Sequence, residues 1–519
     1  MAGDERSWWG WGRTDQALDD DQVRALGETR VRPFLGGSLD GHVTPVPPVP
    51  DLPAPRVRPP SALASLCAAD ARTRAAHALG KAYRDVARAL TGRLDAPPDL
   101  VAYPRAEADV SALLDWAAGA GVAVVPYGGG SSVVGGVEYR GDAPWLSLDT
   151  SRLDGVEVDD VNRVARAGAG VFGPALEARL RPAGLTLRHY PQSFEFSTVG
   201  GWVATRAGGH FATGPTHIDD LVQALRVVTP VGVAGTARVP ASGAGPAPHR
   251  LFLGSEGTLG VVSAAWLRVR PRPRFTAAAT VRFPGYADSL DAVRAVARSG
   301  LQPSNCRLLD PLEAALQAGA RDGDARLLLG FESADVPVDA PLAHAVDLCR
   351  AHGGVPEPAT DGRDTAGRWR GAFLRAPYLR DALIRLGLIV ETVETACGWD
   401  RFPDLHAAVV TAACAAAPGG TALVSYRFTH VYPDGPAPYF TILAPARRGA
   451  EVAGWDAIKL AVNDAIAAAG GTVTHHHAVG RDHRRWYDAE RPEPFAAALR
   501  AAKSALDPAG VLNPGVLIG

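Results

Sequence analysis

The sequence has few cysteines, and they form no pattern. Five cysteines are scattered through 519 residues, and no two of them form a C-x-x-C pair. An odd number of dispersed cysteines argues against a disulfide framework and against a zinc knuckle. We therefore expect the protein to work in a reducing compartment, without structural zinc.

The sequence also lacks a basic block and a long apolar run. Lys plus Arg number 53 and Asp plus Glu number 55, which leaves a net charge of -2. A nucleic-acid partner is therefore not expected. The best candidate for a membrane span, residues 407–424, is rich in Ala and Thr and is interrupted by Pro418, Gly419 and Gly420. The acidic start, Met-Ala-Gly-Asp-Glu-Arg, does not resemble a signal peptide. We predict a soluble, cytoplasmic protein.

The length and texture of the chain predict several domains. A chain of 519 residues is longer than one hydrophobic core usually supports. Short apolar runs alternate with helical patterns up to about residue 270, and the next region favours an antiparallel sheet with helices on one face. We place an arm and helical segment at 1–93, an α/β domain at 94–272, a second domain at 273–444 and a C-terminal segment at 445–519.

The first 60 residues have the composition of an arm. The prolines between Pro45 and Pro60 favour an extended chain. Trp8, Trp9 and Trp11 would anchor this arm to the surface of its own protein. A proline-rich ligand for a recognition domain is the alternative. Apolar residues at helical spacing predict a pair of helices over 62–90.

Three glycine-rich segments carry the strongest functional signal. Pro126-Tyr-Gly-Gly-Gly-Ser-Ser follows an apolar strand, and it matches neither G-x-G-x-x-G nor a Walker sequence. Taken alone, it could be a tight turn. Residues 192–208 and 254–260 add further glycines and hydroxyl side chains. Such segments let backbone N–H groups approach an anion closely, so we predict one long cofactor that passes all three.

These segments resemble the FAD-binding half of the vanillyl-alcohol-oxidase, or p-cresol methylhydroxylase (PCMH), type of flavoprotein. A more specific resemblance, to the alkyldihydroxyacetonephosphate synthase (alkylglycerone-phosphate synthase) family, covers nearly the whole chain. It is carried by the W-x-G-W-G type start, S-F-E-F-S-T-V-G-G-W, G-S-E-G-T-L-G-V and the triplet H-H-H, in that order. The resemblance implies an α+β, two-domain fold in which an antiparallel-sheet cap covers a PCMH-type FAD-binding domain.

The same resemblance implies a reaction and its substrates. These enzymes exchange the acyl chain of acyl-dihydroxyacetone phosphate for a long-chain alcohol, which forms the first ether bond of ether lipids, and the flavin remains oxidised overall. The partners would be small lipid substrates. Peripheral membrane contact for substrate uptake and a homodimer both stay open.

The family's FAD contacts can be transferred one residue at a time. Many superfamily members carry a histidine, joined covalently to the flavin, where this chain has Ser131, so noncovalent FAD is expected. The transferred contacts are Pro126, Tyr127, Gly128, Gly129, Gly130, Ser131, Ser132, Gln192, Ser193, Phe194, Glu195, Phe196, Ser197, Thr198, Thr205, Arg206, Ala207, Gly208, Glu256, Gly257, Thr258, Leu259, Gly260, Val261 and Val262.

The family's catalytic positions also have counterparts here. Tyr439 matches the tyrosine assigned to proton transfer, and Arg380, within Tyr-Leu-Arg-Asp, matches the arginine that contacts the substrate phosphate. The remaining matches are Arg307, His475, His476 and His477. Three positions depart from the family pattern, namely Gln192 for Asp, Ala478 for Gly and Arg481 for Lys. These departures bear on substrate identity more than on cofactor binding.

Without the resemblance, these residues have ordinary interpretations. Tyr439 could be an interior strand tyrosine, and as a base it would need a neighbouring cation or a histidine relay because its ordinary pKa is about 10. Arg307 and Arg380 could be surface or ion-paired arginines. In a strand, the first and third histidines of the triplet would share a face and could hold a metal, but no Cys, Asp or Glu lies beside them, so we predict none. His189 and His210 could line the site or be structural.

Two other functions remain open. A flavin-dependent 2-hydroxy-acid (D-lactate type) dehydrogenase or oxidase shares the two-domain plan, but such enzymes commonly carry Glu-His-Gly where this chain has His476-His477-Ala478. A flavin-binding protein without catalysis is the third interpretation, and the presence of Arg307, Arg380, Tyr439 and the histidines counts against it.

Overall fold

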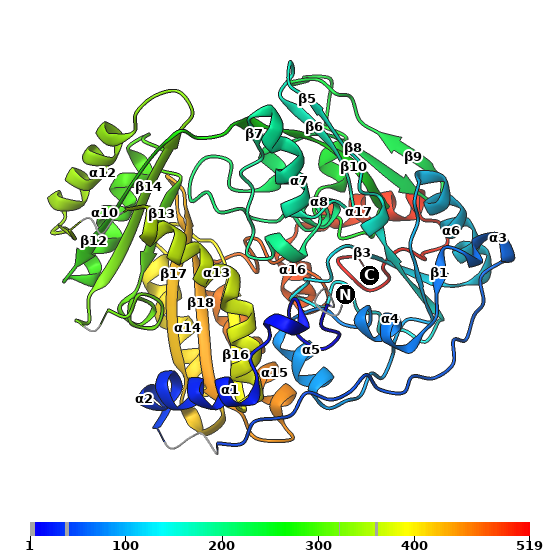
Figure 1. Ribbon diagram of the computed structural model, residues 1–519, viewed down its shortest axis with the longest axis horizontal. Helices are drawn as coiled ribbons and strands as arrows, with labels where there is room; N and C mark the ends of the chain where they lie inside the picture. Colours follow the sequence, from blue (N-terminus) through cyan, green and yellow to red (C-terminus); the bar gives the residue numbers. More distant parts are fainter. Residues whose placement is uncertain (1–5, 37–40, 321, 359–361, 519) are drawn as a thin grey trace.

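The protein consists of two lobes, each built around β-sheets (Figure 1). The structure is a computed structural model that describes residues 6–36, 41–320, 322–358 and 362–518. One lobe holds a four-stranded and a five-stranded sheet, and the other holds a seven-stranded sheet. The predicted α+β class, with an antiparallel cap sheet, is confirmed.

The four-stranded sheet carries the first glycine segment. Strands β2, β4 and β3 run parallel, as expected for βαβ units, and β1 pairs antiparallel at the edge of the sheet. The end of the chain returns to this sheet, because Val124 donates to the Val511 carbonyl and accepts from Asn513. The elements are β1 (Cys67–Ala68), β2 (Leu100–Ala102), α6 (Glu107–Ala120), β3 (Ala123–Tyr127) and β4 (Trp145–Asp149).

The five-stranded sheet is antiparallel and places the second and third glycine segments. Its order is β5-β6-β10-β8-β9, and α8, which carries the buried Trp202, packs beside β10. The strands of this sheet are β5 (Val156–Asp159), β6 (Val164–Gly168), β8 (Val222–Thr229), β9 (Gly232–Gly235) and β10 (Val261–Arg268), and the helices in this part of the chain are α7 (Gly173–Leu180), α8 (Val199–Thr205) and α9 (His249–Phe252). The short strands β7 (Leu185–Thr186) and β11 (Arg270–Pro271) pair with each other in a separate two-stranded sheet.

The cap lobe is one antiparallel sheet in the order β15-β12-β14-β13-β17-β18-β16. The helices α10, α12, α14 and α15 contact these strands. Residues of the helices and of the strands together form the largest hydrophobic cluster of the described residues. The elements are β12 (Phe275–Phe283), α10 (Tyr286–Arg298), β13 (Asn305–Leu309), α11 (Pro311–Glu313), β14 (Ala325–Ser333), α12 (Asp339–Ala351), β15 (Val355–Pro356), α13 (Gly362–Arg385), β16 (Leu388–Glu394), α14 (Phe402–Ala416), β17 (Leu423–Val431), β18 (Pro436–Pro445) and α15 (Glu451–Ala468).

The N-terminal arm lies on the protein's own surface, as predicted. Trp8, Trp9 and Trp11 are only 5–7% exposed, so they are anchors. The described residues 41–60 form neither helix nor strand, which agrees with the extended prediction. The arm also contains two helices, α1 (Asp20–Leu26) and α2 (Arg32–Leu35), and α1 contacts α13 (Figure 1).

The predicted helical pair over 62–90 is wrong. This segment contains three short helices, α3 (Ser61–Ala64), α4 (Ala71–Ala76) and α5 (Tyr83–Leu90), with β1 between the first two. Pairing of Cys67 and Ala68 with β2 interrupts the helical pattern. The Asp70 side chain then accepts from the Thr73 backbone N–H at 2.9 Å and starts a new helix.

The C-terminal segment continues from α15 through a non-helical stretch that contains the histidine triplet, and then forms α16 (Arg484–Glu490) and α17 (Glu493–Leu506). Within the described residues, no helix combines the length and the apolar character that crossing a membrane requires.

Candidate active site

One cavity of about 1240 Å³ brings the predicted site residues together. All three glycine segments line it, and β16, β17, β18 and the histidine turn (residues 474–478) supply the facing wall from the cap lobe and the C-terminal segment. Arg307, Arg380, Tyr439, His476 and His477 are among the lining residues. The cavity therefore joins parts of the chain that lie more than 300 residues apart.

The first glycine segment packs directly on the second. A Cβ atom on Gly129 would lie 1.8 Å from the Phe196 carbonyl oxygen, and Gly130 has a φ of +66°. Both positions therefore require glycine. Among the residues that the structure describes, none accepts a hydrogen bond from the backbone N–H groups of Gly130, Ser131 or Ser132. Three successive available N–H groups on a cavity wall suit a pyrophosphate.

The third segment is tied by Glu256 to the two residues that directly follow the histidine turn. Its carboxylate accepts from the backbone N–H groups of Val479 at 2.9 Å and Gly480 at 2.8 Å. Burial raises the pKa of Glu256 to about 7, against the effect of these two bonds. Glu256 therefore holds the chain directly after the histidine turn against the FAD-binding lobe.

Most of the predicted cofactor contacts line the cavity, and a few lie behind its wall. Phe194 stacks on Trp202, and Leu259 is fully buried in the core. Arg206 pairs with Asp219 at 2.8 Å. The predicted contacts outside the lining are Phe194, Glu195, Phe196, Arg206, Thr258 and Leu259. These six residues support the cavity wall, because each belongs to a segment whose other residues line the cavity. A sequence motif does not distinguish residues that line a cavity from residues that lie behind its wall.

Tyr439 lies in the middle of a cross-strand row. It pairs with Arg427 of β17 on one side and with Glu394 of β16 on the other, so the three residues share one face of the sheet. The Arg427 guanidinium carbon lies 4.1 Å from the centre of the Tyr439 ring. Burial raises the pKa of Tyr439, and the charge of Arg427 and a hydrogen bond with the Thr392 hydroxyl offset part of this rise. The resting residue is therefore a neutral phenol.

Arg427 is held beside Tyr439 by a buried ion pair. Its Nη1 atom donates to Glu313 at 2.6 Å, and the Ser425 hydroxyl donates to the other oxygen of the same carboxylate at 2.7 Å. Arg307, on β13, is 5% exposed, and burial together with the charge of Arg427 lowers its pKa to about 9. With a pKa of about 9, Arg307 remains cationic at neutral pH, so this wall attracts anions.

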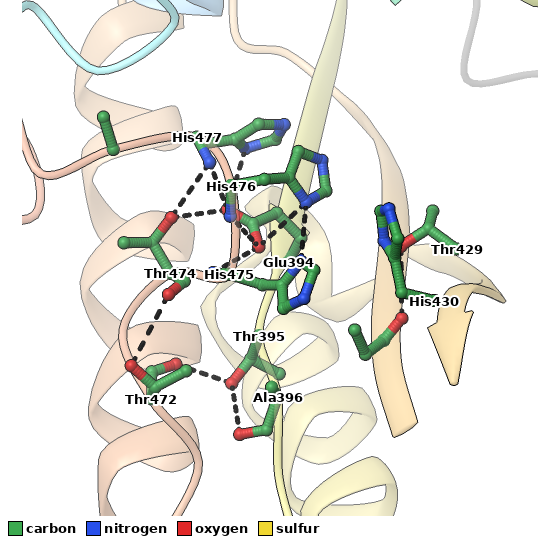
Figure 2. A network of polar contacts seen from close by, with 12 residues as sticks. Glu394, Thr395, Ala396, Thr429, His430, Thr472, Thr474, His475, His476 and His477 are labelled. Carbon is green, nitrogen blue, oxygen red and sulfur yellow. Dashed lines mark hydrogen bonds and ion pairs between the residues drawn. The ribbon is translucent and has the colours of Figure 1, made fainter. Parts of the chain in front are cut away.

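Glu394 organises the histidine turn (Figure 2). Its carboxylate accepts from the backbone N–H groups of His475, His476 and His477 at 2.5, 3.1 and 2.8 Å, and from the Thr474 hydroxyl at 2.5 Å. Although burial opposes ionisation, the pKa of Glu394 lies well below its ordinary value, because the backbone N–H groups of the histidines and the Thr474 hydroxyl donate to its carboxylate. A buried carboxylate thus fixes three successive residues in one turn.

The histidines do not form a strand, so the alternating geometry considered from the sequence is wrong. His476 lies nearly parallel to the Tyr439 ring, with centroids 6.1 Å apart, and His477 meets it edge-on at 5.6 Å. Burial lowers the pKa of both, that of His476 to about 3, so both are neutral imidazoles. His475 points elsewhere, and its Nε2 atom bonds the Tyr432 hydroxyl at 2.7 Å.

His430, His475 and His476 each bring one ligand nitrogen within 4.8 Å of the others, a spacing that could hold a metal ion. Hydrogen bonds already use this cluster. The Nδ1 atoms of His475 and His476 are 3.1 Å apart, and His430 bonds Gly209 and Thr429. We interpret the cluster as a packed imidazole wall and assign no metal to it.

Arg380 lies on α13 and lines the cavity. Its Nε and Nη2 atoms donate to Asp381 at 3.1 and 2.8 Å, and Nη1 donates to the Lys81 carbonyl at 2.7 Å. These bonds use three of the five N–H groups of a guanidinium. Arg380 therefore presents a fixed cation to the cavity.

His189 and His210 lie outside the cavity lining. His189 is buried and His210 is half-buried, and the buried ring nitrogens of both have no hydrogen-bond partner among the described residues. Burial lowers the pKa of His189 to about 3 and that of His210 well below its ordinary value. Of the two interpretations, the structure favours the structural one.

Comparison with known proteins identifies the family. Residues 98–236 match the FAD binding domain family, and residues 272–517 match FAD linked oxidases, C-terminal domain. An alkyldihydroxyacetonephosphate synthase of Caenorhabditis elegans is 32% identical over 487 residues, which cover 86% of this chain and 81% of that protein. The chain belongs to the alkyldihydroxyacetonephosphate synthase family.

Other comparisons agree with this assignment. The solved structure of an alkyldihydroxyacetonephosphate synthase superposes with a TM-score of 0.82 at 24% identity, covers 98% of both chains, and so supports the fold. A D-lactate dehydrogenase of Archaeoglobus fulgidus is more distant, at 27% identity over 451 residues, or 82% of this chain and 95% of that protein. FAD is the cofactor, as predicted.

Noncovalent attachment of FAD stays a prediction that rests on Ser131. This residue lines the cavity, and a serine hydroxyl is not expected to form the covalent link to the flavin that a histidine can form. Acid precipitation of the protein should leave the yellow chromophore in the supernatant. Flavin that sediments with the denatured chain would contradict noncovalent binding.

Glu394 supplies a second prediction, because sequence reasoning gave it no role. Glu394→Gln places an amide NH₂ group where a carboxylate oxygen now receives backbone N–H donors, so the histidine turn should shift. We expect turnover to fall by about 10²-fold while FAD stays bound, since a shift of about 1 Å in catalytic geometry can have that effect. Turnover and flavin content measured on the same preparation test this.

Glu391→Gln is the matched control for Glu394→Gln. Glu391 lies on the same strand, is also buried, and bonds Lys459 at 2.9 Å, but it does not line the cavity. Both substitutions should lower stability, and only Glu394→Gln should strongly lower turnover. Equal losses of turnover would show that Glu394 acts through stability alone.

Proposed function

We propose that this protein exchanges the acyl chain of an acylated dihydroxyacetone phosphate for a long-chain alcohol. The ester C–O bond of the donor is replaced by an ether C–O bond, and a fatty acid leaves, with no net oxidation. The observation that carries this proposal is the wall formed by Arg427, Tyr439, His476 and His477 on the cavity that the FAD-binding glycine segments line.

The cavity offers a complementary environment for each part of such a donor. Arg380 and Arg307 supply cations for a phosphate. Apolar side chains from the arm, α13 and the cap sheet also line this cavity and suit an alkyl chain; they are Leu18, Leu26, Val31, Leu379, Leu383, Val390 and Leu443.

Proton transfer falls to the residues around Tyr439. When bound, FAD supplies an electron-poor ring beside the substrate. The neutral imidazoles of His476 and His477 can accept a proton, and an entering phosphate would raise their lowered pKa values because a nearby anion favours the charged form. Tyr439 holds a phenolic proton to donate, and Arg427 stabilises the phenolate that remains.

Anaerobic mixing with palmitoyl-dihydroxyacetone phosphate and hexadecanol tests the proposal. Mass spectrometry should detect hexadecyl-dihydroxyacetone phosphate and palmitate, with no electron acceptor consumed. D-lactate and related acids should not bleach the flavin at useful rates. Rapid anaerobic bleaching by a 2-hydroxy acid, without ether product, would refute the exchange reaction and favour the dehydrogenase.

We further propose, from the sequence, a cytoplasmic protein. Peripheral membrane contact is also a proposal, supported by the lipid character of the expected substrates. A homodimer stays a prediction that sedimentation of the FAD-loaded protein can test.

A further inference from the structure

The tryptophan turn (residues 6–13) lies between the FAD-binding loop and α13. The turn is closed by its own hydrogen bonds, from Ser7 N–H to the Gly12 carbonyl at 2.8 Å and from Gly10 N–H to the Ser7 hydroxyl at 2.9 Å. Arg6 donates to the Gly129 carbonyl of the glycine loop. Trp11 packs edge-on against Phe196, with centroids 5.8 Å apart, and also lines the cavity. The turn is therefore part of the site wall as well as an anchor.

Asp381 joins this turn to Arg380. One carboxylate oxygen accepts from the Trp11 backbone N–H at 2.5 Å, and the other accepts from Nε and Nη2 of Arg380 at 3.1 and 2.8 Å. Asp381 is only 5% exposed, so water competes little for these bonds. The plane of the Arg380 guanidinium is thus set by a carboxylate whose position depends on the backbone of the turn.

Two glycines give the turn its close fit to α13. A Cβ atom on Gly10 would lie 2.7 Å from the Asp381 Oδ2 atom. Gly12 has a φ of +62°, and its Cβ atom would lie 2.0 Å from the Tyr378 hydroxyl oxygen, which also accepts from the Arg13 backbone N–H at 3.0 Å. Tyr378, Arg380 and Asp381 belong to one stretch of α13, so a larger residue in the turn would displace that stretch.

A surface anchor alone does not require these contacts. Buried tryptophans suffice to attach an arm, and they do so through apolar contact. Here the Trp11 backbone N–H of the turn also donates to the Asp381 carboxylate. That carboxylate orients Arg380, the residue proposed to bind the phosphate. Bidentate recognition of an anion by arginine depends on the orientation of the guanidinium plane.

We propose that the tryptophan turn is a positioning element of the phosphate-binding site and acts on Arg380 through Asp381. This inference rests on the proposed function, because that function makes the phosphate of the acylated donor the ligand of Arg380. The turn does not touch the phosphate, so its residues are positioning residues.

Gly12→Ala and Gly36→Ala test the inference as a matched pair. Gly36 lies in the same arm and also has a positive φ, +58°, but a Cβ atom there would meet no atom of the described residues within 4 Å. Both variants place an alanine at a positive φ, and only Gly12→Ala pushes on α13. The KM for palmitoyl-dihydroxyacetone phosphate should rise about 10-fold to 100-fold in Gly12→Ala, since misplacement by about 1 Å can have such effects.

Three further measurements show whether the turn positions Arg380 or only attaches the arm to the protein. They are the KM for hexadecanol, the FAD content and the midpoint of thermal unfolding. In Gly12→Ala, the hexadecanol KM should stay within about twofold of wild type, and FAD content should match Gly36→Ala. If Gly12→Ala does not fold, Gly10→Ala, which presses on Asp381 directly, gives the decisive measurement. An unchanged donor KM, or equal losses for both substrates, would overturn the inference.

Arg380→Ala in the same assays separates this inference from the proposed function. Loss of donor saturation in Arg380→Ala, with none in Gly12→Ala and Gly10→Ala, would leave the function in place and refute the role of the turn. If Arg380→Ala saturates normally, Arg380 does not bind the phosphate, and the inference fails together with that part of the function.

Discussion

Replacing Tyr439 by phenylalanine should lower turnover by about 10²-fold or more, because positioned acid–base groups contribute about that much. The substitution keeps the ring against Arg427 and the imidazoles of His476 and His477, and it removes only the hydroxyl that bonds Thr392. The phenol is neutral at rest, so its loss should remove a proton donor from the site. Flavin content and the flavin spectrum should stay the same.

Tyr83→Phe is the matched control for Tyr439→Phe. The Tyr83 hydroxyl is buried and has no hydrogen-bond partner among the described residues, and Tyr83 does not line the cavity. Its removal should change neither turnover nor stability by much. Steady-state rates of the two variants, each normalised to bound FAD, test this comparison. A Tyr439→Phe enzyme that keeps most of its turnover would exclude the hydroxyl from proton transfer.

The FAD-binding segments could be predicted from the sequence because their signals are local. Each segment combines glycines and hydroxyl residues within a short stretch, and such a stretch can adopt left-handed and closely packed backbone conformations that other residues rarely adopt. Gly129 shows the physical basis, since any side chain there would collide with the Phe196 carbonyl. The arm could be predicted for a similar reason, because its prolines and tryptophans are close in sequence.

The wall around Tyr439 could not be predicted in full, because the pairing of three strands creates it. Glu394 and Arg427 flank Tyr439 only through the register of β16, β18 and β17. Nothing in the sequence near Glu394 shows that its carboxylate receives three backbone N–H groups from residues about 80 positions later. The strand geometry considered for the histidines failed for the same reason, since this distant carboxylate bends them into a turn.

The helical pair over 62–90 failed because a tertiary contact outweighed helix propensity. Cys67 and Ala68 extend the edge of a sheet formed by residues 100–149, and Asp70 begins the next helix. Propensity within a window of this length is a weak guide once such pairing is available. Strand pairing and buried carboxylates thus account for both errors and for the missed residues Glu394 and Arg427.

Arg380→Ala should raise the KM for the acylated phosphate more than any other single substitution, apart from substitutions of Arg427, Tyr439, His476 and His477. Arg380 is tied to Asp381 and to the Lys81 carbonyl, which leaves a preorganised part of its donor fork for the ligand. Truncating one partner of a buried charge pair typically costs about 2–5 kcal/mol. Since each 1.4 kcal/mol is about tenfold in affinity, the donor KM should rise by about 30-fold to several thousand-fold.

Arg380→Lys grades this effect and separates charge from geometry. Lysine keeps the cation but cannot reproduce the planar fork, so its donor KM should lie between those of wild type and Arg380→Ala. All three proteins should show the same flavin spectrum and nearly the same KM for hexadecanol, because the alcohol carries no phosphate. Saturation curves for palmitoyl-dihydroxyacetone phosphate decide the matter. If the alanine variant saturates like wild type, the phosphate binds elsewhere, and Arg307 with Arg427 becomes the next cationic site to test on the same cavity wall.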